Sequence, residues 1–243
     1  MRVVVVIPAL NEERGIGKVL ADLPSGELLE VIVVDNGSSD RTAEVARSLG
    51  ARVIEEAERG YGAACLAGIA AAKECDVVAF VDADYSDFPG ELPELLAPIE
   101  RGEADLVIGS RMIQKESRAA LLPQARFGNW LSGLLLSRLF GAKVTDLGPF
   151  RAIRSAALRA LEMDDRRFGW TVQMQARAFA RGFRVREVPV SYRPRIGKSK
   201  ISGTLMGSFR AGMTILWTIG AEFLRRRRPR ITHESDVTHV PRG

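Results

Sequence analysis

Four short, β-branched apolar runs, separated by stretches with helical periodicity, constrain the fold of this chain more than any other feature of its sequence. The runs lie at residues 3–7, 31–34, 77–81 and 106–108. Runs of this kind are typical of strands buried on both faces of a parallel sheet. Apolar residues recur three and four positions apart at 12–23, 42–49 and 62–73, and a short strand fits at 52–54. The βαβα order predicts an α/β fold with a mostly parallel central sheet flanked by helices.

The second half of the chain is less regular. It adds two expected helices, at 127–140 and 171–181, and an alternating strand at 184–190. A chain of 243 residues, 46% of them hydrophobic, can bury one substantial core. We therefore expect one α/β domain over residues 1–203, followed by an amphipathic helical segment with a polybasic end over 204–228. Residues 229–243 are polar and unpatterned, so we expect a disordered tail.

The formal net charge of +5 comes from the C-terminal end of the chain. From Arg225 onward there are six Arg and two acidic residues, which leaves 29 basic and 28 acidic residues before it. A nucleic-acid-binding protein usually spreads Lys and Arg over a folded face with aromatic residues between them, and no such stripe occurs in the body of this chain. The composition therefore argues against nucleic acid as a partner.

The two cysteines, Cys65 and Cys75, stand without a Cys-x-x-Cys pair or a His cluster near them. We expect packed, reduced thiols, as in a cytoplasmic protein. The N-terminal apolar run is about six residues long and ends at Pro8 instead of at a small-residue cleavage site. It is therefore predicted to be a strand and not a secretory signal.

The strongest chemical signal is Asp82-Ala83-Asp84, which directly follows the apolar run at 77–81. In a parallel sheet, ligands bind outside the carboxyl ends of the strands. Two carboxylates this close repel each other unless a cation lies between them, and Mg²⁺ or Mn²⁺ bound to a diphosphate supplies such a cation. The alternative is a solvated acidic turn that also caps the helix expected after Pro89.

Two other strand ends carry polar side chains that should open on the same edge of the sheet. Asn11 and Glu12 follow the first strand, and Asp35 follows the second at the start of a flexible turn. An acidic residue at a strand end can accept hydrogen bonds from the base or the ribose hydroxyl groups of a nucleotide. Either loop alone is better explained by ordinary turn and capping chemistry, but three such strand ends in order favour a nucleotide site.

In this order the motifs resemble glycosyltransferase family 2 with a GT-A fold, and especially the dolichyl- or polyprenyl-phosphate mannose and glucose synthases. The resemblance covers roughly residues 1–204 and implies a GT-A catalytic domain over 1–203. The matching pieces are IPALNEE, VVDNGSSDRT, GYGAACLAGIAAA, FVDAD, LVIGSR, VTDLGPFRAIR, GWTVQMQARAFARGFRVREVPV and YRPRIGKSK. Several motifs in order are far more specific than any one of them. One departure is Gln173, where glutamate is frequent in the family.

The resemblance also implies roles for individual residues. Those implied for the nucleotide-sugar pocket are Pro8, Ala9, Asn11, Glu12, Asp35, Asp82, Arg195, Ser199 and Lys200. Asp82 and Asp84 would hold Mg²⁺ or Mn²⁺, and Arg111 and Arg126 would face the acceptor phosphate. Arg195, Ser199 and Lys200 belong to a basic loop that would close over the donor diphosphate. The composition of the loop is consistent with this role, because Gly197 makes the loop flexible and its Arg and Lys side chains can stabilise a departing diphosphate. The alternative is a solvated basic turn.

Family 2 enzymes of this kind invert the anomeric centre in one displacement, so the acceptor oxygen must lie in line with the leaving diphosphate. A hydroxyl acceptor needs a general base, whereas a phosphate acceptor is already an anion and needs none. Asp146 resembles a family position near the acceptor and is the candidate base. Its alternative role is to cap a helix before Phe150.

A lipid acceptor is suggested by two amphipathic segments. The segment at 204–224 is strongly apolar, but Arg210 and Glu222 leave only eleven uncharged residues between them, short of the ~20 that a spanning helix needs. It can lie in the membrane interface instead. Residues 225–228 are all Arg, and each contributes ~1 kcal/mol near an anionic leaflet. The expected helix at 127–140, with Trp130, would give a second contact. We expect a peripheral protein on the cytoplasmic face of a membrane; the alternative is that both helices belong to the core.

The leading hypothesis is transfer of a hexose from GDP-mannose or UDP-glucose to polyprenyl or dolichyl phosphate, with a homodimer left open. One rival is the same chemistry on a soluble hydroxyl acceptor, which the lipid dependence of turnover would distinguish. A rival of another class is a non-catalytic nucleotide-sugar-binding module. That module would bind the donor without forming product and would lose nothing on changing Asp84 to Ala.

Overall fold

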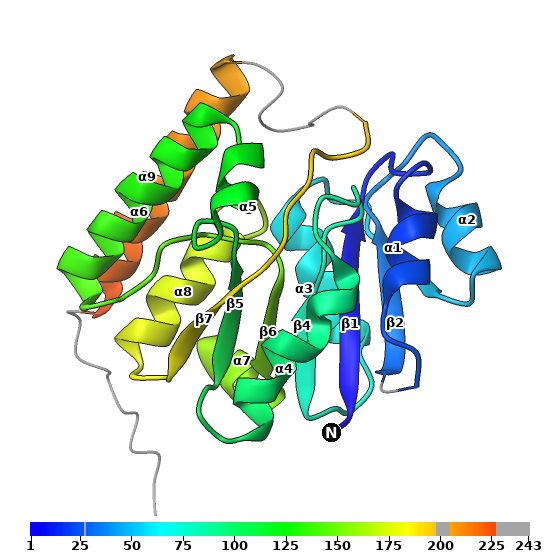
Figure 1. Cartoon of the computed structure of the whole chain (residues 1–243), viewed down its shortest axis with the longest axis horizontal. Helices are drawn as coiled ribbons and strands as arrows, with labels where there is room; N and C mark the ends of the chain where they lie inside the picture. Colours follow the sequence, from blue (N-terminus) through cyan, green and yellow to red (C-terminus); the bar gives the residue numbers. More distant parts are fainter. Residues whose placement is uncertain (27, 198–204, 227–243) are drawn as a thin grey trace, which may run out of the picture.

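The structure is a computed structural model that describes residues 1–26, 28–197 and 205–226. Within these residues, seven strands form one sheet in the order β3-β2-β1-β4-β6-β5-β7 (Figure 1). The strands are β1 (Val3–Ala9), β2 (Leu28–Asp35), β3 (Arg52–Glu55), β4 (Val77–Phe80), β5 (Leu106–Ser110), β6 (Arg151–Arg154) and β7 (Val185–Pro189). Strand β6 runs antiparallel to β4 and β5, and the other neighbouring pairs are parallel. The predicted mostly parallel α/β sheet is confirmed.

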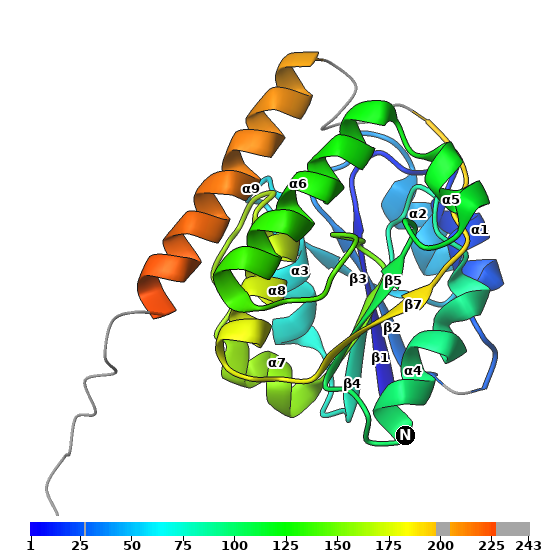
Figure 2. The same cartoon turned by 60° about the vertical axis from the view of Figure 1, so that its left-hand side comes forward.

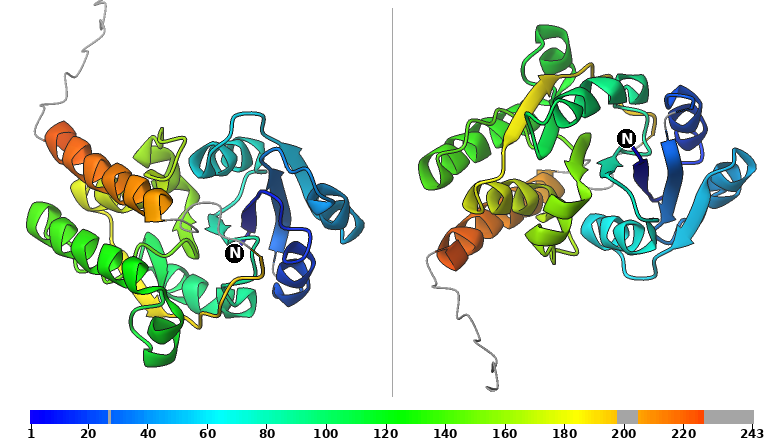
Figure 3. Two further views of the ribbon diagram at one scale, coloured as in Figure 1. Left: turned by 90° about the horizontal axis from the view of Figure 1, so that it is seen from above. Right: turned by 90° about the horizontal axis from the view of Figure 1, so that it is seen from below.

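Helices cover both faces of the sheet (Figure 3). They are α1 (Ile16–Asp22), α2 (Thr42–Ser48), α3 (Tyr61–Ala71), α4 (Leu92–Glu100), α5 (Lys115–Ala120), α6 (Pro123–Phe140), α7 (Ser155–Leu161), α8 (Trp170–Ala180) and α9 (Leu205–Arg226). Side chains alternate along each strand, so Val4 and Val6 of β1 pack in the core beneath α3, α7 and α8, whereas Val3 and Val5 pack beneath α1 and α4. The continuous apolar runs of the sequence follow from this burial on both faces.

Two elements differ from the expectations. The helix expected from residue 12 begins only at Ile16, because residues 10–15 form a turn in which Asn11 has a φ of 53°. Strand β6 has no counterpart among the predicted strands. It is four residues long and has an arginine at each end, so no apolar periodicity marks it.

The chain order of the strands creates a switch point between β1 and β4. The chain passes from β1 outward to β2 and β3, then returns to β4 on the other side of β1. The loops after β1 and β4 therefore leave the sheet in different directions and open a crevice at the carboxyl ends of these strands. This crevice is the place where the fold positions a ligand.

Helices α6 and α9 form an outer layer beyond α8 (Figure 2). They lie side by side in all views, and their C-terminal ends meet, since the rings of Phe140 and Phe223 are 5.9 Å apart. Helix α9 falls within the segment for which the sequence predicts an amphipathic helix. The predicted disordered tail at 229–243 lies outside the described residues.

Candidate active site

A pocket of about 350 Å³ opens at the switch point between β1 and β4. Its volume falls within the range of ligand pockets. The loops after β1, β2 and β4, the start of α3 and the segment before α8 supply its walls. The lining residues are Pro8, Ala9, Leu10, Glu12, Asn36, Arg59, Gly60, Tyr61, Ala64, Asp82, Ala83, Asp84, Arg167, Phe168 and Arg195. Of the predicted pocket residues, Pro8, Ala9, Glu12, Asp82 and Arg195 therefore come together here, beside Asp84.

Asp82 and Asp84 lie two and four residues after the end of β4 and line the pocket. Asp82 Oδ1 accepts a hydrogen bond of 3.1 Å from the hydroxyl of Tyr61. Asp84 is buried; its Oδ1 accepts a 3.0 Å hydrogen bond from the backbone N–H of Ser86, and its Oδ2 lies 3.1 Å from Nη1 of Arg195. Each carboxylate is thus fixed by one neutral donor, and Arg195 supplies a positive charge.

The two carboxylates form a site that favours a cation. Burial, together with the charge of Asp84, raises the pKa of Asp82 to about 7, although Arg195 and Arg111 act in the opposite direction. No cluster of three or more His, Cys, Asp or Glu side chains among the described residues is arranged to hold a metal ion. A pair of carboxylates that needs positive charge suits a divalent ion that takes its remaining ligands from water and from substrate phosphates. The residues present therefore fit the metal that the sequence predicts.

This electrostatic cost predicts a stability effect. Because the pKa of Asp82 is higher in the folded chain than in the unfolded chain, the folded state binds the proton more tightly, and stability falls as pH rises from about 4 to about 7. Asp82→Asn removes this fall, so we expect the variant to melt at a higher temperature than the native protein at pH 8, with the difference shrinking toward pH 5. Thermal unfolding of both proteins between pH 5 and pH 8, in the presence of a chelator, measures this difference in melting temperature.

A matched control for this effect is Asp76→Asn. Asp76 is exposed, and its hydrogen bonds with the backbone and side chain of Arg2 lower its pKa, so its removal should give no gain at pH 8. An Asp82→Asn protein that melts below the native protein at pH 8 would contradict the expectation.

Three arginines surround the pocket. Arg59 and Arg167 are exposed at its rim, and Arg195 is half-buried beside Asp84. The Arg59 guanidinium donates a 3.0 Å hydrogen bond to the carbonyl of Gly37, which fixes it at the end of the loop after β2. A rim of guanidinium groups facing two carboxylates suits an anionic ligand that also carries a metal ion, as a diphosphate does.

The loops after β1 and β2 are locked to each other. The side-chain oxygen of Asn11 accepts a 2.7 Å hydrogen bond from the backbone N–H of Ser39, and the backbone N–H of Asn11 donates to Ser38 Oγ at 2.9 Å. Asp35 Oδ1 accepts a 3.0 Å bond from the backbone N–H of Ser38. In this structure Asn11 and Asp35 therefore hold the rim of the pocket and are not among its lining residues. Asn36 lines it instead, and its side chain bonds the backbone of residues 56, 58 and 60.

A second charged group lies at the end of β5. Asp146 is buried, and its two oxygens accept hydrogen bonds of 2.8 Å from the backbone N–H, Nε and Nη2 of Arg111. Glu187 on β7 accepts hydrogen bonds from the backbone N–H groups of Thr145 and Asp146 at 2.8 and 2.9 Å, which fixes this loop. The alternative role expected for Asp146, capping a helix before Phe150, is wrong, because Asp146 binds Arg111 and is followed by strand β6. Arg111 is close enough to Asp82 to lower the pKa of that carboxyl.

The remaining predicted site residues are dispersed. Arg126 is exposed on α6, and no hydrogen bond or ion pair in the described part of the chain ties it to Arg111 or Asp84. Ser199 and Lys200 lie outside the described residues. The segment that leads to them lies along the acidic loop, since the backbone N–H of Ile196 donates to the carbonyl of Asp84 at 2.9 Å.

Several site residues were not predicted from the sequence. Tyr61, Arg167 and Phe168 reach the pocket from α3 and from the segment before α8. Asp87 is buried near Asp82 and Asp84 with neither carboxylate oxygen hydrogen-bonded to the described residues, and burial raises its pKa well above the ordinary value. Only its position three residues after Asp84 could have drawn attention to it.

Comparisons with known proteins show which sequences and folds this chain resembles. The model of the family described as Glycosyl transferase family 2 matches residues 4–161. The chain is 39% identical to a dolichyl-phosphate hexose transferase of Haloferax volcanii, over 81% of this chain and 85% of that protein. It is 32% identical to an undecaprenyl-phosphate mannosyltransferase of Micrococcus luteus, over 93% and 99% of the two chains.

Among solved structures, the fold is similar to that of glucosyl-3-phosphoglycerate synthase from Mycobacterium tuberculosis, in a complex with Mn²⁺, UDP and glucosyl-3-phosphoglycerate. The TM-score is 0.72 at 24% identity, over 91% of this chain and 79% of that chain. At this level of identity the likeness concerns the fold alone.

Proposed function

Because the chain belongs to glycosyltransferase family 2 and has the GT-A fold, we propose that it transfers a hexose from a nucleotide sugar to polyprenyl phosphate, with a divalent metal ion and with inversion at the anomeric carbon. The observation that carries the proposal is the pocket at the switch point, where Asp82 and Asp84 lie among three arginines. Relatives named for transfer to dolichyl and undecaprenyl phosphate support the acceptor. GDP-mannose and UDP-glucose are the donors we propose to test.

The donor side of the reaction rests on charge. Asp82 and Asp84 would hold Mg²⁺ or Mn²⁺, which, when bound, neutralises charge on the leaving diphosphate. Arg59 and Arg167 face the same space from the rim and can bind phosphate oxygens. Arg195 pairs with Asp84 at 3.1 Å, and we propose that it transfers this contact to the diphosphate when the donor binds.

The acceptor side rests on the pair formed by Arg111 and Asp146. Both oxygens of Asp146 are engaged by Arg111, so the carboxylate is placed to orient the guanidinium and is poorly placed to take a proton. A phosphate acceptor needs an oriented cation and no general base, whereas a hydroxyl acceptor needs the base. The geometry therefore favours an anionic acceptor, with Arg111 near its phosphate and Asp146 as a positioning residue. Arg126 remains a proposed second contact with that phosphate.

A lipid acceptor also needs a surface that reaches the membrane. Helices α6 and α9 expose large apolar side chains, with Trp130 58% and Trp217 78% exposed. The others are Phe127, Leu134, Met213 and Leu224. Among the described residues, no helix is both long enough and apolar enough to cross a membrane. We propose that these two helices lie against the bilayer surface, where tryptophan is favoured.

The polybasic end contributes less to this surface than four free arginines would. Arg225 Nη1 lies 3.3 Å from Asp164 and 3.4 Å from Glu222, and Arg226 donates a 3.3 Å hydrogen bond to the carbonyl of Leu139. Two of the four positive charges are therefore partly engaged by the protein. Arg227 and Arg228 lie outside the described residues.

The double variant Trp130→Ser/Trp217→Ser tests the membrane surface. If about half of each indole leaves water on binding, each contributes about 1 kcal/mol, so the variant should bind anionic lipid vesicles roughly tenfold or more weakly. Vesicle co-sedimentation measures the affinity. Leu49→Ser is a matched control, because Leu49 is 55% exposed at the end of α2, on the far side of the sheet (Figure 1). Unchanged binding by the double variant would exclude this surface.

The proposed function is tested by measuring nucleotide release. GDP-mannose and UDP-glucose are incubated with Mn²⁺ or Mg²⁺, with and without a short polyprenyl phosphate. Release that depends on both the metal ion and the lipid phosphate, together with a new glycolipid, is the expected result. Turnover with a soluble hydroxyl acceptor, independent of lipid, would favour the rival enzyme, and donor binding without product would favour a binding module.

A further inference from the structure

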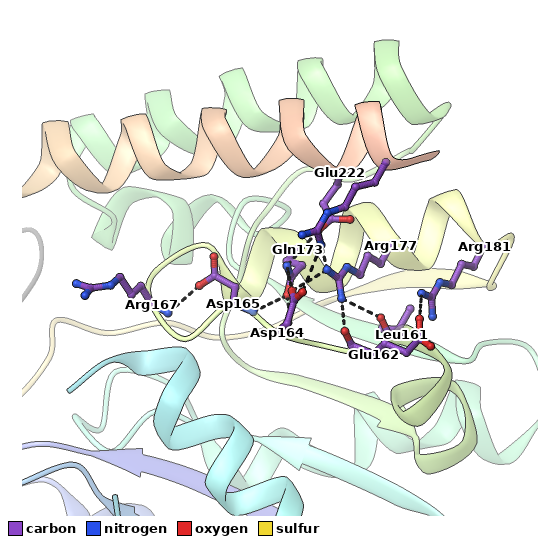
Figure 4. A network of polar contacts seen from close by, with 10 residues as sticks. Leu161, Glu162, Asp164, Asp165, Arg167, Gln173, Arg177, Arg181 and Glu222 are labelled. Carbon is purple, nitrogen blue, oxygen red and sulfur yellow. Dashed lines mark hydrogen bonds and ion pairs between the residues drawn. The ribbon is translucent and has the colours of Figure 1, made fainter. Parts of the chain in front are cut away.

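A polar cluster of three buried side chains and the exposed Asp164 joins α9 to the wall of the donor pocket (Figure 4). It consists of Gln173 and Arg177 on α8, Glu222 on α9, and Asp164 in the segment 162–169 between α7 and α8. We infer that Gln173, Arg177 and Glu222 are positioning residues for the donor, because they fix this segment where its end forms the pocket wall. The inference rests on the donor pocket proposed above.

Glu222 is the buried residue that α9 contributes to the cluster, and Arg225 of α9 lies at its exposed side, 3.3 Å from Asp164 and 3.4 Å from Glu222. Its Oε1 accepts hydrogen bonds from Arg177 Nη2 at 2.9 Å and from Gln173 Nε2 at 3.1 Å. The side chains of Arg177 and Glu222 are each only 7% exposed, so this ion pair is screened little by solvent. Burial lowers the pKa of Arg177, but the carboxylates of Glu222 and Asp164 outweigh this effect and raise it above its ordinary value.

Gln173 connects Glu222 to the backbone of the segment. Its side-chain oxygen accepts hydrogen bonds from the backbone N–H groups of Asp164 at 3.1 Å and Asp165 at 2.9 Å. Its side-chain nitrogen donates to Asp164 Oδ1 at 2.7 Å as well as to Glu222. A neutral amide is needed here, because a glutamate at position 173 could not donate to either of these carboxylates. The departure from the family pattern thus has a local cause: Gln173 lies beside the carboxylate that α9 supplies.

The segment in turn supports the pocket. The carbonyls of Arg166 and Arg167 accept hydrogen bonds from the backbone N–H groups of Ala63 and Gly62, in the first turn of α3, at 2.9 and 3.1 Å. The preceding residue of α3 is Tyr61, whose hydroxyl bonds Asp82. Arg167 and Phe168 line the pocket themselves. A displacement of the segment would therefore move both the pocket wall and the hydroxyl that holds a proposed metal ligand.

The segment is closely packed against α3 and α9. A Cβ atom on Gly62 would lie 2.1 Å from the carbonyl oxygen of Asp165, and one on Gly169 would lie 2.4 Å from Thr218 Oγ1 of α9 and 2.3 Å from Asp165 Oδ2. Helix α9 thus touches the end of the segment directly as well as through Glu222. Close packing of this kind transmits displacement instead of absorbing it.

The test compares Glu222→Gln with a matched control. Glu222→Gln keeps the shape of the side chain but removes the charge that Arg177 faces. Glu162→Gln makes the same chemical change in the same segment, at a carboxylate that is 73% exposed and pairs with Arg181. Binding of UDP and GDP with Mn²⁺ is measured by calorimetry, and kcat and KM are measured with the donor.

We expect Glu222→Gln to raise the nucleotide dissociation constant and the donor KM by about tenfold, with kcat at saturating donor within about twofold of the native value. Glu162→Gln should change neither. Gly169→Ala, which pushes α9 from the segment without changing any charge, should reproduce the rise in KM. Amide hydrogen exchange at Gly62 and Ala63 should quicken in both Glu222→Gln and Gly169→Ala.

Native nucleotide affinity and native exchange in both variants would overturn the inference. A native chain that binds neither UDP nor GDP would instead overturn the proposed function. In that case, exchange at Gly62 and Ala63 alone decides whether α9 fixes the segment. A fall in kcat without a rise in KM would also contradict a positioning role for the donor.

Discussion

Asp84→Asn is expected to lower metal-dependent turnover by about a thousandfold, which corresponds to about 4 kcal/mol of transition-state stabilisation. Asp84 is buried at the end of β4, and its carboxylate is one of two that would hold the metal ion. The amide of Asn keeps one oxygen ligand but loses the negative charge that attracts a hard cation. Single-turnover rates at saturating Mn²⁺ and donor separate this loss from weaker binding.

The fold should survive the change, because Asn can still accept the hydrogen bond from the backbone N–H of Ser86 through its side-chain oxygen. Thermal unfolding checks this. Glu103→Gln is a suitable control, since Glu103 pairs with Arg101 before β5, at the opposite edge of the sheet, and its neutralisation should leave turnover unchanged. Full activity of Asp84→Asn would refute the metal assignment.

Asp146→Asn is expected to destabilise the protein by about 3–5 kcal/mol. The side chain of Asp146 is fully buried and that of Arg111 is 13% exposed, so the variant leaves a guanidinium without its counter-charge. For a chain of this size the melting temperature should fall by roughly 6–20 °C. Turnover should fall as well, because Arg111 loses the two-oxygen contact that orients it. Thermal unfolding and steady-state kinetics on the soluble variant measure the two effects.

The structure offers a close control for this prediction. Arg184 binds Asp105 with the same pattern, through its backbone N–H, Nε and Nη2, but 56% of its side chain is exposed. Asp105→Asn should therefore cost about 1 kcal/mol or less, because solvent screens the charge that remains. Equal losses in the two variants would mean that burial does not set the strength of the Arg111 pair.

The sheet could be predicted because its signals are local. Strands β1, β2, β4 and β5 are read from continuous apolar runs, and these runs reflect burial on both faces of the sheet. Strand β6 was not predicted, because it is defined by its pairing with β4 and β5 and not by a pattern in its own residues. The site was predictable to the same extent: Asp82, Asp84, Pro8 and Glu12 lie at strand ends, where the fold class alone places ligands.

The residues that complete the site were not predictable in this way. Tyr61 reaches Asp82 across 21 positions, Asp146 holds Arg111 across 35, and Glu222 pairs with Arg177 across 45. Sequence periodicity reports which face of an element is apolar, but it carries no information about which polar side chains from distant elements meet. That depends on how α3, α8 and α9 pack on the sheet.

By itself, the sequence determined the α/β class, every strand except β6 and the acidic strand end, because alternation, run length and neighbouring carboxylates are properties of a few consecutive residues. Only the tertiary structure decided that Asp146 orients Arg111, that Asn11 and Asp35 hold the rim of the pocket, and that α9 is joined through Glu222 to the segment that forms the pocket wall. The pairs of Asp146 with Arg111 and of Glu222 with Arg177 form because packing brings these charged groups together where little water reaches them and an unpaired charge is costly.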